Sequence, residues 1–575
     1  MKLYKKLFSR WTGVAMLATM GLFACQPEIE VETPVSGSAD FTTYIALGNS
    51  LTAGYADGGV YREGQINSYP EMIANSIREV NSTLTFSTPL MPEGNGSGYL
   101  QLQVINGNPT PVPVAADPSA FASVASGGPY QNMGVPGARV KNLTQVGYGS
   151  GQGNPFYARF ASNPGATVVG EAAAQNPSFF TLWIGNNDVL GYATSGGDQG
   201  GDQITPVDEF KADFDKIMAG MNGASGGAIA NIPNILAAPY FTTAAYNAFV
   251  IDAAQATALN AGLRATVGAN VRPLVVAGVR EQVRVQVVAG AIETVIRPQV
   301  LAQVRIGVTA QVRQGAIDQA LAGGATQAQA EALADAFVAS SDGQALIDAQ
   351  YEAFIASEAG QEQIQAGIEG ALALPSTQAL IEAQTDQQMQ SEQVQAIIEQ
   401  TLNQQLDTLL AGLTVSEGAN PFIIQGAPSE GNPTGLRKAT PDDLILLTVL
   451  AYTASPEFQA LPVLPESLVL DASEQAKVTA AIDAYNQVIR EKAGSKYAYV
   501  DINQFFGKVI SGFSYQGVGY SPTFVTGGAF SLDGIHLTQR GYALAGNEFI
   551  KAINAKYNSN LSLINTNDYR GVLFP

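Results

Sequence analysis

Short apolar runs that end in glycine or in polar turns alternate with amphipathic helical patterns at both ends of this chain. The run at 43–47 is followed directly by Gly48, and Phe179–Ile184 leads into Gly-Asn-Asn-Asp. Further strands are predicted at 228–232 and 497–501, and helices at 69–80, 207–221, 474–491 and 538–557. Strands that are apolar throughout suit a parallel sheet with both faces buried. The alternation therefore predicts an α/β fold whose sheet is covered by helices on both sides.

The middle of the chain has a different character. Residues 253–413 are rich in Ala, Gln and Val, have few aromatic residues and contain no lysine. Val275 begins a series of valines spaced every four residues, which predicts a helical stripe. An internal repeat has an offset of 25, and it pairs Arg272-Pro273 with Arg297-Pro298, Val279-Arg280 with Val304-Arg305, and 290–292 with 315–317. A second echo pairs 344–347 with 378–381. Both prolines are expected in first turns of helices.

We expect residues 253–413 to form several helices packed into an arm or cap, inserted into an α/β domain made of residues 41–252 and 414–575. The length of 575 residues also accommodates two to four separate domains. Two interpretations of the insertion stay open. In the first, the insertion has a function, either as a lid or as a surface that binds a membrane or a protein partner of unknown identity. In the second, it is a helical expansion without chemistry.

The N-terminus has the features of a targeting segment. Lys2, Lys5, Lys6 and Arg10 precede an apolar run that ends in Leu22-Phe23-Ala24-Cys25. This resembles a bacterial lipobox, in which the signal peptide (1–24) is removed and the cysteine is lipidated. Residues 25–40 then form a flexible tether, and lipid on Cys25 anchors the protein in the cell envelope, at the outer membrane, facing either the periplasm or the exterior. An ordinary signal peptide with an accidental cysteine is the alternative.

Charge and composition exclude several classes of function. The formal net charge of −20 disfavours binding to nucleic acid. A chain with one histidine and one cysteine has no His/Cys cluster for zinc. The paired Gly-Asp steps at 197–198 and 201–202 lack the spacing of a calcium loop, and the glycine-rich stretch at 147–153 lacks the strand and helix of a dinucleotide site. We therefore expect no metal and no cofactor.

The single histidine, His536, follows Asp533 by three residues. An imidazole is the only side chain with an ordinary pKa near neutrality, and a nearby carboxylate can fix its tautomer. Ser50 lies in Gly48-Asn49-Ser50-Leu51, directly after the first predicted strand. The hydroxyl of a serine at this point is exposed above the sheet, and its own N–H can stabilise an oxyanion. An isolated histidine is more often a packed or surface residue, but Asp533 and the motifs at 48–51, 132–139 and 185–188 favour a catalytic role for His536.

Two further polar loops follow predicted strand ends. In the stretch 132–139, Gly137 can bring a bare backbone N–H close to a substrate. In 185–188, the side chain of Asn187 offers an uncharged NH₂ donor that suits an oxyanion hole. Each loop taken alone is also explained as a simple turn.

In this order, the four segments resemble the motifs of the SGNH hydrolase superfamily, also called GDSL esterases and lipases. The resemblance covers residues 41–250 and 415–557. It implies a three-layer α/β/α sandwich with a parallel, flavodoxin-like sheet. It also implies Ser50 as nucleophile with Asp533 and His536 as triad partners, and an oxyanion hole of Ser50, Gly137 and Asn187. The family usually has Asp where this chain has Asn49.

The resemblance implies hydrolysis of a carboxylic ester through an acyl-enzyme. The substrate is a lipid, another acyl ester or an acetylated glycan, so a carbohydrate O-deacetylase is one alternative. A second alternative is a membrane-anchored binding lipoprotein that has kept the scaffold without the activity.

Overall fold

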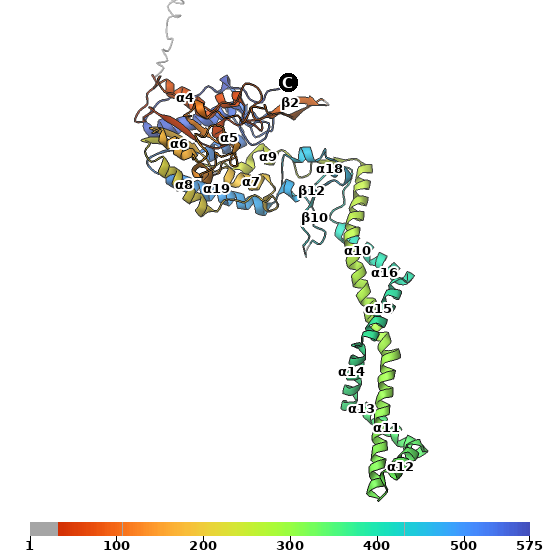
Figure 1. Ribbon diagram of the computed structural model, residues 1–575. Helices are drawn as coiled ribbons and strands as arrows, with labels where there is room; N and C mark the ends of the chain where they lie inside the picture. The colour runs from red at the N-terminus through yellow and green to blue at the C-terminus, as the bar shows by residue number, and fades with distance from the viewer. Residues whose placement is uncertain (1–32, 106, 430–431) are drawn as a thin grey trace, which may run out of the picture. The chain divides into compact units, whose positions relative to one another are not determined.

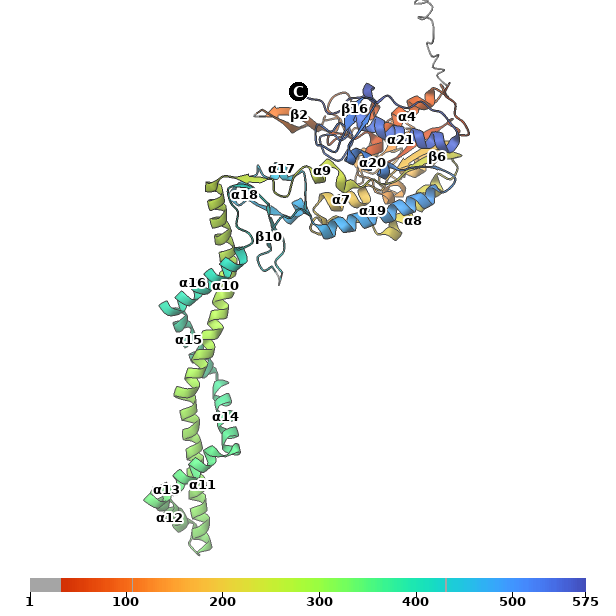
Figure 2. The ribbon, with the colours of Figure 1, turned by 180° about the vertical axis from the view of Figure 1, so that it is seen from behind.

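The computed structural model describes residues 33–105, 107–429 and 432–575 (Figures 1 and 2). The predicted signal peptide and the predicted lipidation site, Cys25, lie outside these residues. Contacts divide the chain into two compact units. Of the described residues, 33–248, 439–458 and 464–575 make up the α/β unit, and those within 249–438 and 459–463 make up the helical unit.

The α/β unit is built on a five-stranded parallel sheet with the strand order β14-β6-β5-β1-β4. The strands are β1 (Tyr44–Gly48), β4 (Asn132–Gly134), β5 (Phe179–Trp183), β6 (Gly226–Ala230) and β14 (Ala498–Val500). Every residue of β1, β5 and β6 is buried, as expected for apolar strands covered on both faces. The predicted α/β fold with a parallel sheet is confirmed.

Helices cover both faces of this sheet, which makes three layers (Figure 2). One layer holds α4 (Tyr69–Arg78) and α21 (Gln539–Tyr557), and the other holds α6 (Val168–Ala174), α8 (Val207–Gly220) and α19 (Ala472–Ala493). An aromatic stack joins the helices within each layer. The rings of Tyr69 and Phe549 lie 4.9 Å apart in the first, and those of Phe210 and Tyr485 lie 3.9 Å apart in the second. Such pairs fix the spacing of the helices as well as burying apolar area.

The shorter elements were not all predicted. The short helices are α2 (Ser50–Ala53), α3 (Arg62–Ile66), α5 (Pro155–Ala158), α7 (Asn187–Thr194), α9 (Pro239–Thr242), α17 (Val449–Tyr452), α18 (Pro456–Ala460) and α20 (Ile502–Ser511). The remaining strands are β2 (Tyr99–Ile105), β3 (Asn108–Val114), β7 (Phe249–Ile251), β8 (Gly418–Asn420), β9 (Ile423–Gln425), β10 (Leu436–Lys438), β11 (Leu444–Ile445), β12 (Val463–Pro465), β13 (Val469–Leu470), β15 (Phe513–Tyr515) and β16 (Val518–Tyr520). The longest of them, β2 and β3, form an antiparallel hairpin.

In the helical unit, α10 (Ala253–Ala291), a π-helical turn (Ile292–Ile296) and α11 (Arg297–Ala322) follow one another without a break and form one long central helix (Figure 1). Five shorter helices pack along it: α12 (Gln327–Ala339), α13 (Ser341–Ala356), α14 (Glu358–Leu372), α15 (Pro375–Met389) and α16 (Glu392–Leu410). Short helices paired with a long partner bury apolar faces that none could bury alone.

The predicted valine stripe is buried along the central helix, and Val275, Val279, Val283 and Val287 are each at most 6% exposed. The prediction for Pro273 is wrong, because this proline lies inside α10 rather than in a first turn. Pro298 does lie at the start of α11. The Pro273 ring removes one backbone hydrogen bond, a loss that the long helix tolerates.

The 25-residue offset has a structural explanation. Buried apolar residues recur every eight residues before and after the π-helical turn: Val271, Val279 and Val287, then Ile296, Val304 and Val312. Between Val287 and Ile296 the spacing is nine, and the extra residue falls in the π-helical turn. Since a π-helical turn takes up one residue more than an α-helical turn, it keeps both halves of the stripe facing the short helices.

The short helices repeat every 17 residues. The similarity between 344–347 and 378–381, which the sequence shows directly, spans two of these repeats. Ile347, Ile364, Ile381 and Ile398 occupy one equivalent position and are at most 4% exposed. The side-chain amides of Gln344, Gln361, Gln378 and Gln395 each donate to a carbonyl in the last turn of the preceding helix. Each joint between helices is thus closed by the same bond, which satisfies a carbonyl that a helix end leaves free.

No helix among the described residues has the length and apolar character to cross a membrane.

Candidate active site

The candidate residues gather at the carboxyl edge of the sheet. Strand β1 lies between β4 and β5, so the loop after β1 is flanked by the loops that follow those two strands. Ser50 follows β1, Gly137 follows β4 and Asn187 follows β5. In an open parallel sheet, ligands bind at this edge, where connections leave a central strand in opposite directions.

Ser50 is the first residue of α2, and Asn49 is the residue that caps this helix. The Asn49 side-chain oxygen accepts a hydrogen bond from the Leu51 N–H at 3.0 Å. Its NH₂ group donates to Asn186 at 3.4 Å. An asparagine therefore serves as the helix cap here and also joins the loop after β1 to the loop after β5. With Asn49 in place of the usual Asp, the turn that leads into Ser50 is held by these two side-chain bonds.

His536 and Asp533 come from the loop that precedes α21, a helix capped by Thr538. His536 Nε2 lies 2.8 Å from the Ser50 hydroxyl oxygen, and His536 Nδ1 lies 2.8 Å from Asp533 Oδ2. The side chains of His536 and Asp533 are 13% and 14% exposed. The three predicted side chains thus form one continuous hydrogen-bonded row, although 486 positions separate Ser50 from His536.

The Asp533 carboxylate is held by several donors. Oδ1 accepts bonds from the N–H groups of Ile535 and His536, at 2.9 and 2.8 Å, and Oδ2 accepts one from the Gly58 N–H at 3.0 Å. Burial acts to raise the pKa of Asp533, but the charge of His536 and these hydrogen bonds outweigh burial. The pKa of Asp533 therefore lies well below its ordinary value, and the side chain stays ionised beside the imidazole.

The ring of Tyr55 covers the imidazole. The centroids of the Tyr55 and His536 rings lie 4.3 Å apart, and the Tyr55 hydroxyl donates to the Gly58 carbonyl at 2.6 Å. Burial, together with the charge of Asp533, raises the pKa of Tyr55 to about 12. The phenol is therefore a neutral packing surface that limits the movement of His536.

Three N–H groups lie in the loops that follow β1, β4 and β5 and were predicted to bind an oxyanion. Among the described residues, the backbone N–H groups of Ser50 and Gly137 have no hydrogen-bond partner. Gly137 has φ +79°, a left-handed conformation that favours glycine. The Asn187 side-chain nitrogen donates to the Ala138 carbonyl at 2.9 Å, which leaves its second hydrogen free. Asn187 lines one pocket with Ser50 and His536, whereas Gly137 lies in the adjoining loop and does not line that pocket.

Asp188 braces the loop that carries Gly137. Its carboxylate is fully buried and accepts a hydrogen bond from the Val140 N–H at 3.0 Å. Burial raises the pKa of Asp188 to about 6, and the bond from Val140 opposes this shift. The loops after β4 and β5 are thus tied together twice, by Asn187 and by Asp188.

The pocket around Ser50 and His536 is narrow and mostly apolar. Its apolar walls are Leu51, Leu190, Pro233, Ile235, Ala238, Phe506 and Ile535, and its polar residues are Asn49, Ser50, Asn186, Asn187 and His536. The cavity volume is about 30 Å³. The space beside the hydroxyl therefore suits a small apolar group.

No group of three or more His, Cys, Asp or Glu side chains in the described part of the chain is arranged to hold a metal ion.

Sequence reasoning did not find the residues that support this row. Tyr55, Asp57 and Gly58 lie in a segment that carries no family motif, and they contact residues of the 531–536 loop only through the fold. The one local signal was the Asp57-Gly58 pair, which is typical of a tight turn.

Comparison with known families adds one match. Residues 44–275 match the family model described as GDSL-like Lipase/Acylhydrolase. The matched segment contains Ser50, Gly137 and Asn187, extends into α10, and ends before Asp533 and His536. No curated protein and no solved structure matched the chain.

Proposed function

We propose that this protein, which belongs over residues 44–275 to the GDSL-like lipase and acylhydrolase family, is a serine hydrolase of carboxylic esters. The family supports ester hydrolysis in general. Ser50 is the nucleophile, His536 the general base and acid, and Asp533 the residue that orients the imidazole. The carrying observation is the unbroken row from the Ser50 hydroxyl through His536 to Asp533, with two contacts of 2.8 Å.

The chemistry follows from this row. His536 Nε2 takes the proton from Ser50 as the oxygen attacks the ester carbonyl, and the Asp533 carboxylate stabilises the imidazolium. The oxyanion is stabilised by the N–H of Ser50, the N–H of Gly137 and the free hydrogen of the Asn187 side chain. His536 then protonates the leaving alcohol. Water repeats the sequence on the acyl-enzyme, releases the acid and restores Ser50.

The pocket supports a short acyl group. Its apolar walls suit a hydrocarbon chain, but a cavity of about 30 Å³ has room for little more than an acetyl-sized group. This observation favours short-chain esters, which include the acetyl esters of a carbohydrate O-deacetylase, over long-chain lipids. The alternative of a binding lipoprotein without activity has no support from the geometry, since it leaves the aligned row without a use.

A fluorophosphonate probe tests the proposal directly, because it labels only an activated serine. We expect labelling of the purified protein at Ser50 and hydrolysis of p-nitrophenyl acetate, with both lost in Ser50→Ala. The variant should keep the native circular dichroism spectrum and Tm. A native protein that neither reacts with the probe nor hydrolyses short esters would reject the hydrolase and favour the binding lipoprotein.

A further inference from the structure

A tight turn at 56–59 donates a hydrogen bond to the Asp533 carboxylate. Ala56 and Gly59 exchange two backbone hydrogen bonds of 3.0 Å. Both central residues are left-handed, with φ +54° at Asp57 and +81° at Gly58. Asp-Gly is a favoured pair for a turn with this geometry. The turn points the Gly58 N–H at Asp533 Oδ2, the same oxygen that faces the His536 ring.

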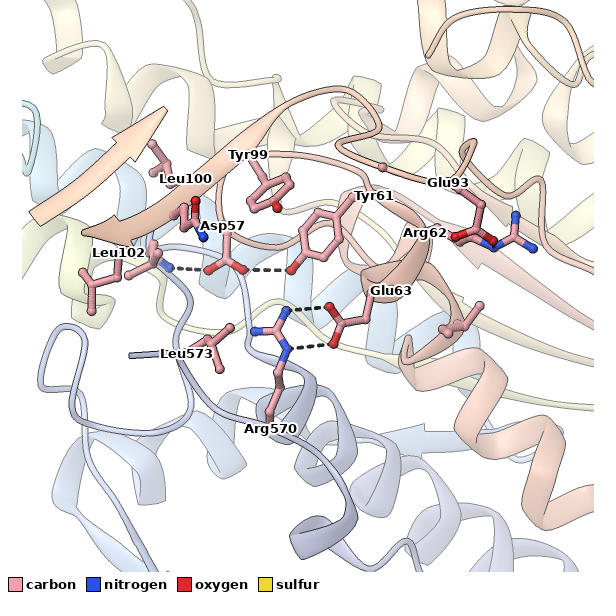
Figure 3. A pocket seen from close by; sticks show the side chains of 14 residues that line it. Asp57, Tyr61, Arg62, Glu63, Glu93, Tyr99, Leu100, Leu102, Arg570 and Leu573 are labelled. Atoms are coloured by element: carbon pink, nitrogen blue, oxygen red, sulfur yellow. Dashed lines mark hydrogen bonds and ion pairs between the residues drawn. The ribbon is translucent and has the colours of Figure 1, made fainter. Parts of the chain in front are cut away.

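The Asp57 side chain fixes this turn to the loop that carries Asp533. Asp57 Oδ1 accepts a bond from the Leu532 N–H at 3.0 Å, and the Asp57 N–H donates to the Ser531 hydroxyl oxygen at 2.9 Å. Asp57 Oδ2 accepts a third bond, from the Tyr61 hydroxyl at 2.8 Å. Figure 3 shows the carboxylate between Tyr61 and the backbone of the 532 region, on the wall of a pocket of about 360 Å³. Asp57 therefore joins segments 475 positions apart.

Burying the Asp57 carboxylate costs free energy of folding, so its presence here suggests a function for it. Asp57 is 8% exposed, and burial raises its pKa even though Leu532 and Tyr61 donate to it. The nearby negative charge of Asp533 raises the pKa of Asp57 further, while Arg570 lowers it. Arg570 itself forms a paired contact with Glu63, as Figure 3 shows.

We propose that Asp57 is a positioning residue for Asp533. By holding the 531–533 loop against the Gly58 N–H, it keeps Asp533 Oδ2 aligned with the imidazole. This inference rests on the hydrolase function proposed above, and it assigns Asp57 no contact with the substrate. A displacement of about 1 Å in such a row is enough to slow a reaction about 100-fold.

Two variants separate positioning from charge. Asp57→Gly removes the carboxylate without straining a left-handed backbone, and we expect kcat to fall about 10- to 100-fold while KM changes less than about 3-fold. Asp57→Asn keeps an acceptor for the Leu532 N–H and is tolerated in this conformation. We expect it to recover most of kcat. Asp117→Ala is the matched control, since Asp117 also accepts a loop N–H, that of Gly96, and lies outside the site.

The single histidine offers a readout that needs no turnover. In protein labelled with ¹⁵N-histidine, the His536 Nδ1 proton should give one downfield NMR signal. We expect the signal to persist in Asp57→Asn and Asp117→Ala and to broaden or vanish in Asp57→Gly. An unchanged signal and an unchanged kcat in folded Asp57→Gly would overturn the positioning role. An equal loss of kcat in Asp57→Asn and Asp57→Gly would also overturn it, because charge rather than alignment would then matter. An inactive native protein with an intact signal would instead reject the hydrolase function alone.

Discussion

The side-chain nitrogen of Asn187 donates a hydrogen bond of 2.9 Å to the carbonyl oxygen of Ala138, the residue after Gly137. One hydrogen of the amide is thereby used to fix the direction of the other. A donor held in place before the reaction does not have to reorganise as charge develops on the substrate. The contact also joins the loop at 185–188 to the loop at 132–139.

Asn187→Ala should therefore lower kcat by about 100- to 1000-fold with little change in KM, because the donor is needed chiefly in the transition state. Steady-state hydrolysis of p-nitrophenyl acetate measures both constants. Asn163→Ala is a suitable control, since the exposed Asn163 amide bonds only to Ser162 and Gly165 in its own surface turn. A loss that appears mainly in KM would show that Asn187 binds the ground state instead.

Asp533→Asn should lower kcat by about 1000- to 10,000-fold, because a neutral amide cannot stabilise the imidazolium or keep the same tautomer. The low pKa of Asp533 in the native protein means that it stays ionised throughout the useful pH range. Since Asp533 does not change charge in this range, the native rate should rise with pH in a single step, as expected for one general base. A pH–rate profile from pH 5 to 8 checks this, and a flat profile would exclude His536 as the base.

Asp188→Asn should stabilise the protein at high pH. The pKa of Asp188 is raised from 3.8 to about 6 in the folded state, so its contribution to stability is complete below pH 4 and is lost as pH rises through 6. A shift of about two pKa units corresponds to at most about 3 kcal/mol. Urea unfolding measures the free energy of unfolding of both proteins at pH 4 and pH 8. The value for the variant, relative to that for the native protein, should be higher at pH 8 than at pH 4. If the difference in free energy of unfolding between the two proteins did not change with pH, the raised pKa of Asp188 in the folded protein would be contradicted.

The acyl preference should be short. Among p-nitrophenyl esters, kcat/KM for acetate should exceed that for octanoate by at least about 10-fold, because a cavity of about 30 Å³ cannot enclose a long chain. Phe506→Ala removes one apolar wall and should reduce the ratio of acetate to octanoate kcat/KM. Ile66→Ala, at a side chain that is 49% exposed and does not line this pocket, should leave the ratio unchanged. Equal rates for all chain lengths would mean that the acyl group binds elsewhere.

The repeated isoleucines of the helical unit should carry its stability. Ile381→Ala removes a side chain that is 1% exposed and should cost about 2–5 kcal/mol. The neighbouring Leu380 is 47% exposed, so Leu380→Ala should change stability by less than about 0.5 kcal/mol. Chemical unfolding followed by circular dichroism compares the two. Similar losses in both variants would mean that this helix does not pack as described.

Most of the sheet was predictable because its longer strands are largely apolar, whereas β4 (Asn132–Gly134), with a polar residue and a glycine, was expected to be part of a loop. The predicted strand at 43–47 is β1 (Tyr44–Gly48), and the predicted helix at 207–221 is α8 (Val207–Gly220). A strand buried on both faces leaves a continuous apolar run in the sequence, so local pattern was enough. The five-residue strand β5 (Phe179–Trp183), with its polar exit, was recognised for the same reason.

The candidate site was only partly predictable. Ser50 and His536 lie in recognisable motifs, and their side chains are in hydrogen-bond contact. Asp57 was missed because its partners lie 475 positions away, a distance at which no spacing rule applies.

The helical unit was misread in detail because its periods are unusual. Pro273 suggested a helix start, but packing along α10 overrides this local preference. The 17-residue period was overlooked because Ile347 and Ile381 are two periods apart and the intervening copy lacks Ala and Leu at the matching positions. The extra residue of the central helix became visible only as the π-helical turn at Ile292–Ile296.

The identical glutamine-closed joints make the helical unit modular. Because the four joints between the short helices are closed by the same bond, a descendant gene could lose or duplicate one 17-residue block, with a matching change in the central helix, and still close every joint. The reach of this unit is thus free to evolve in steps, independently of the residues around Ser50.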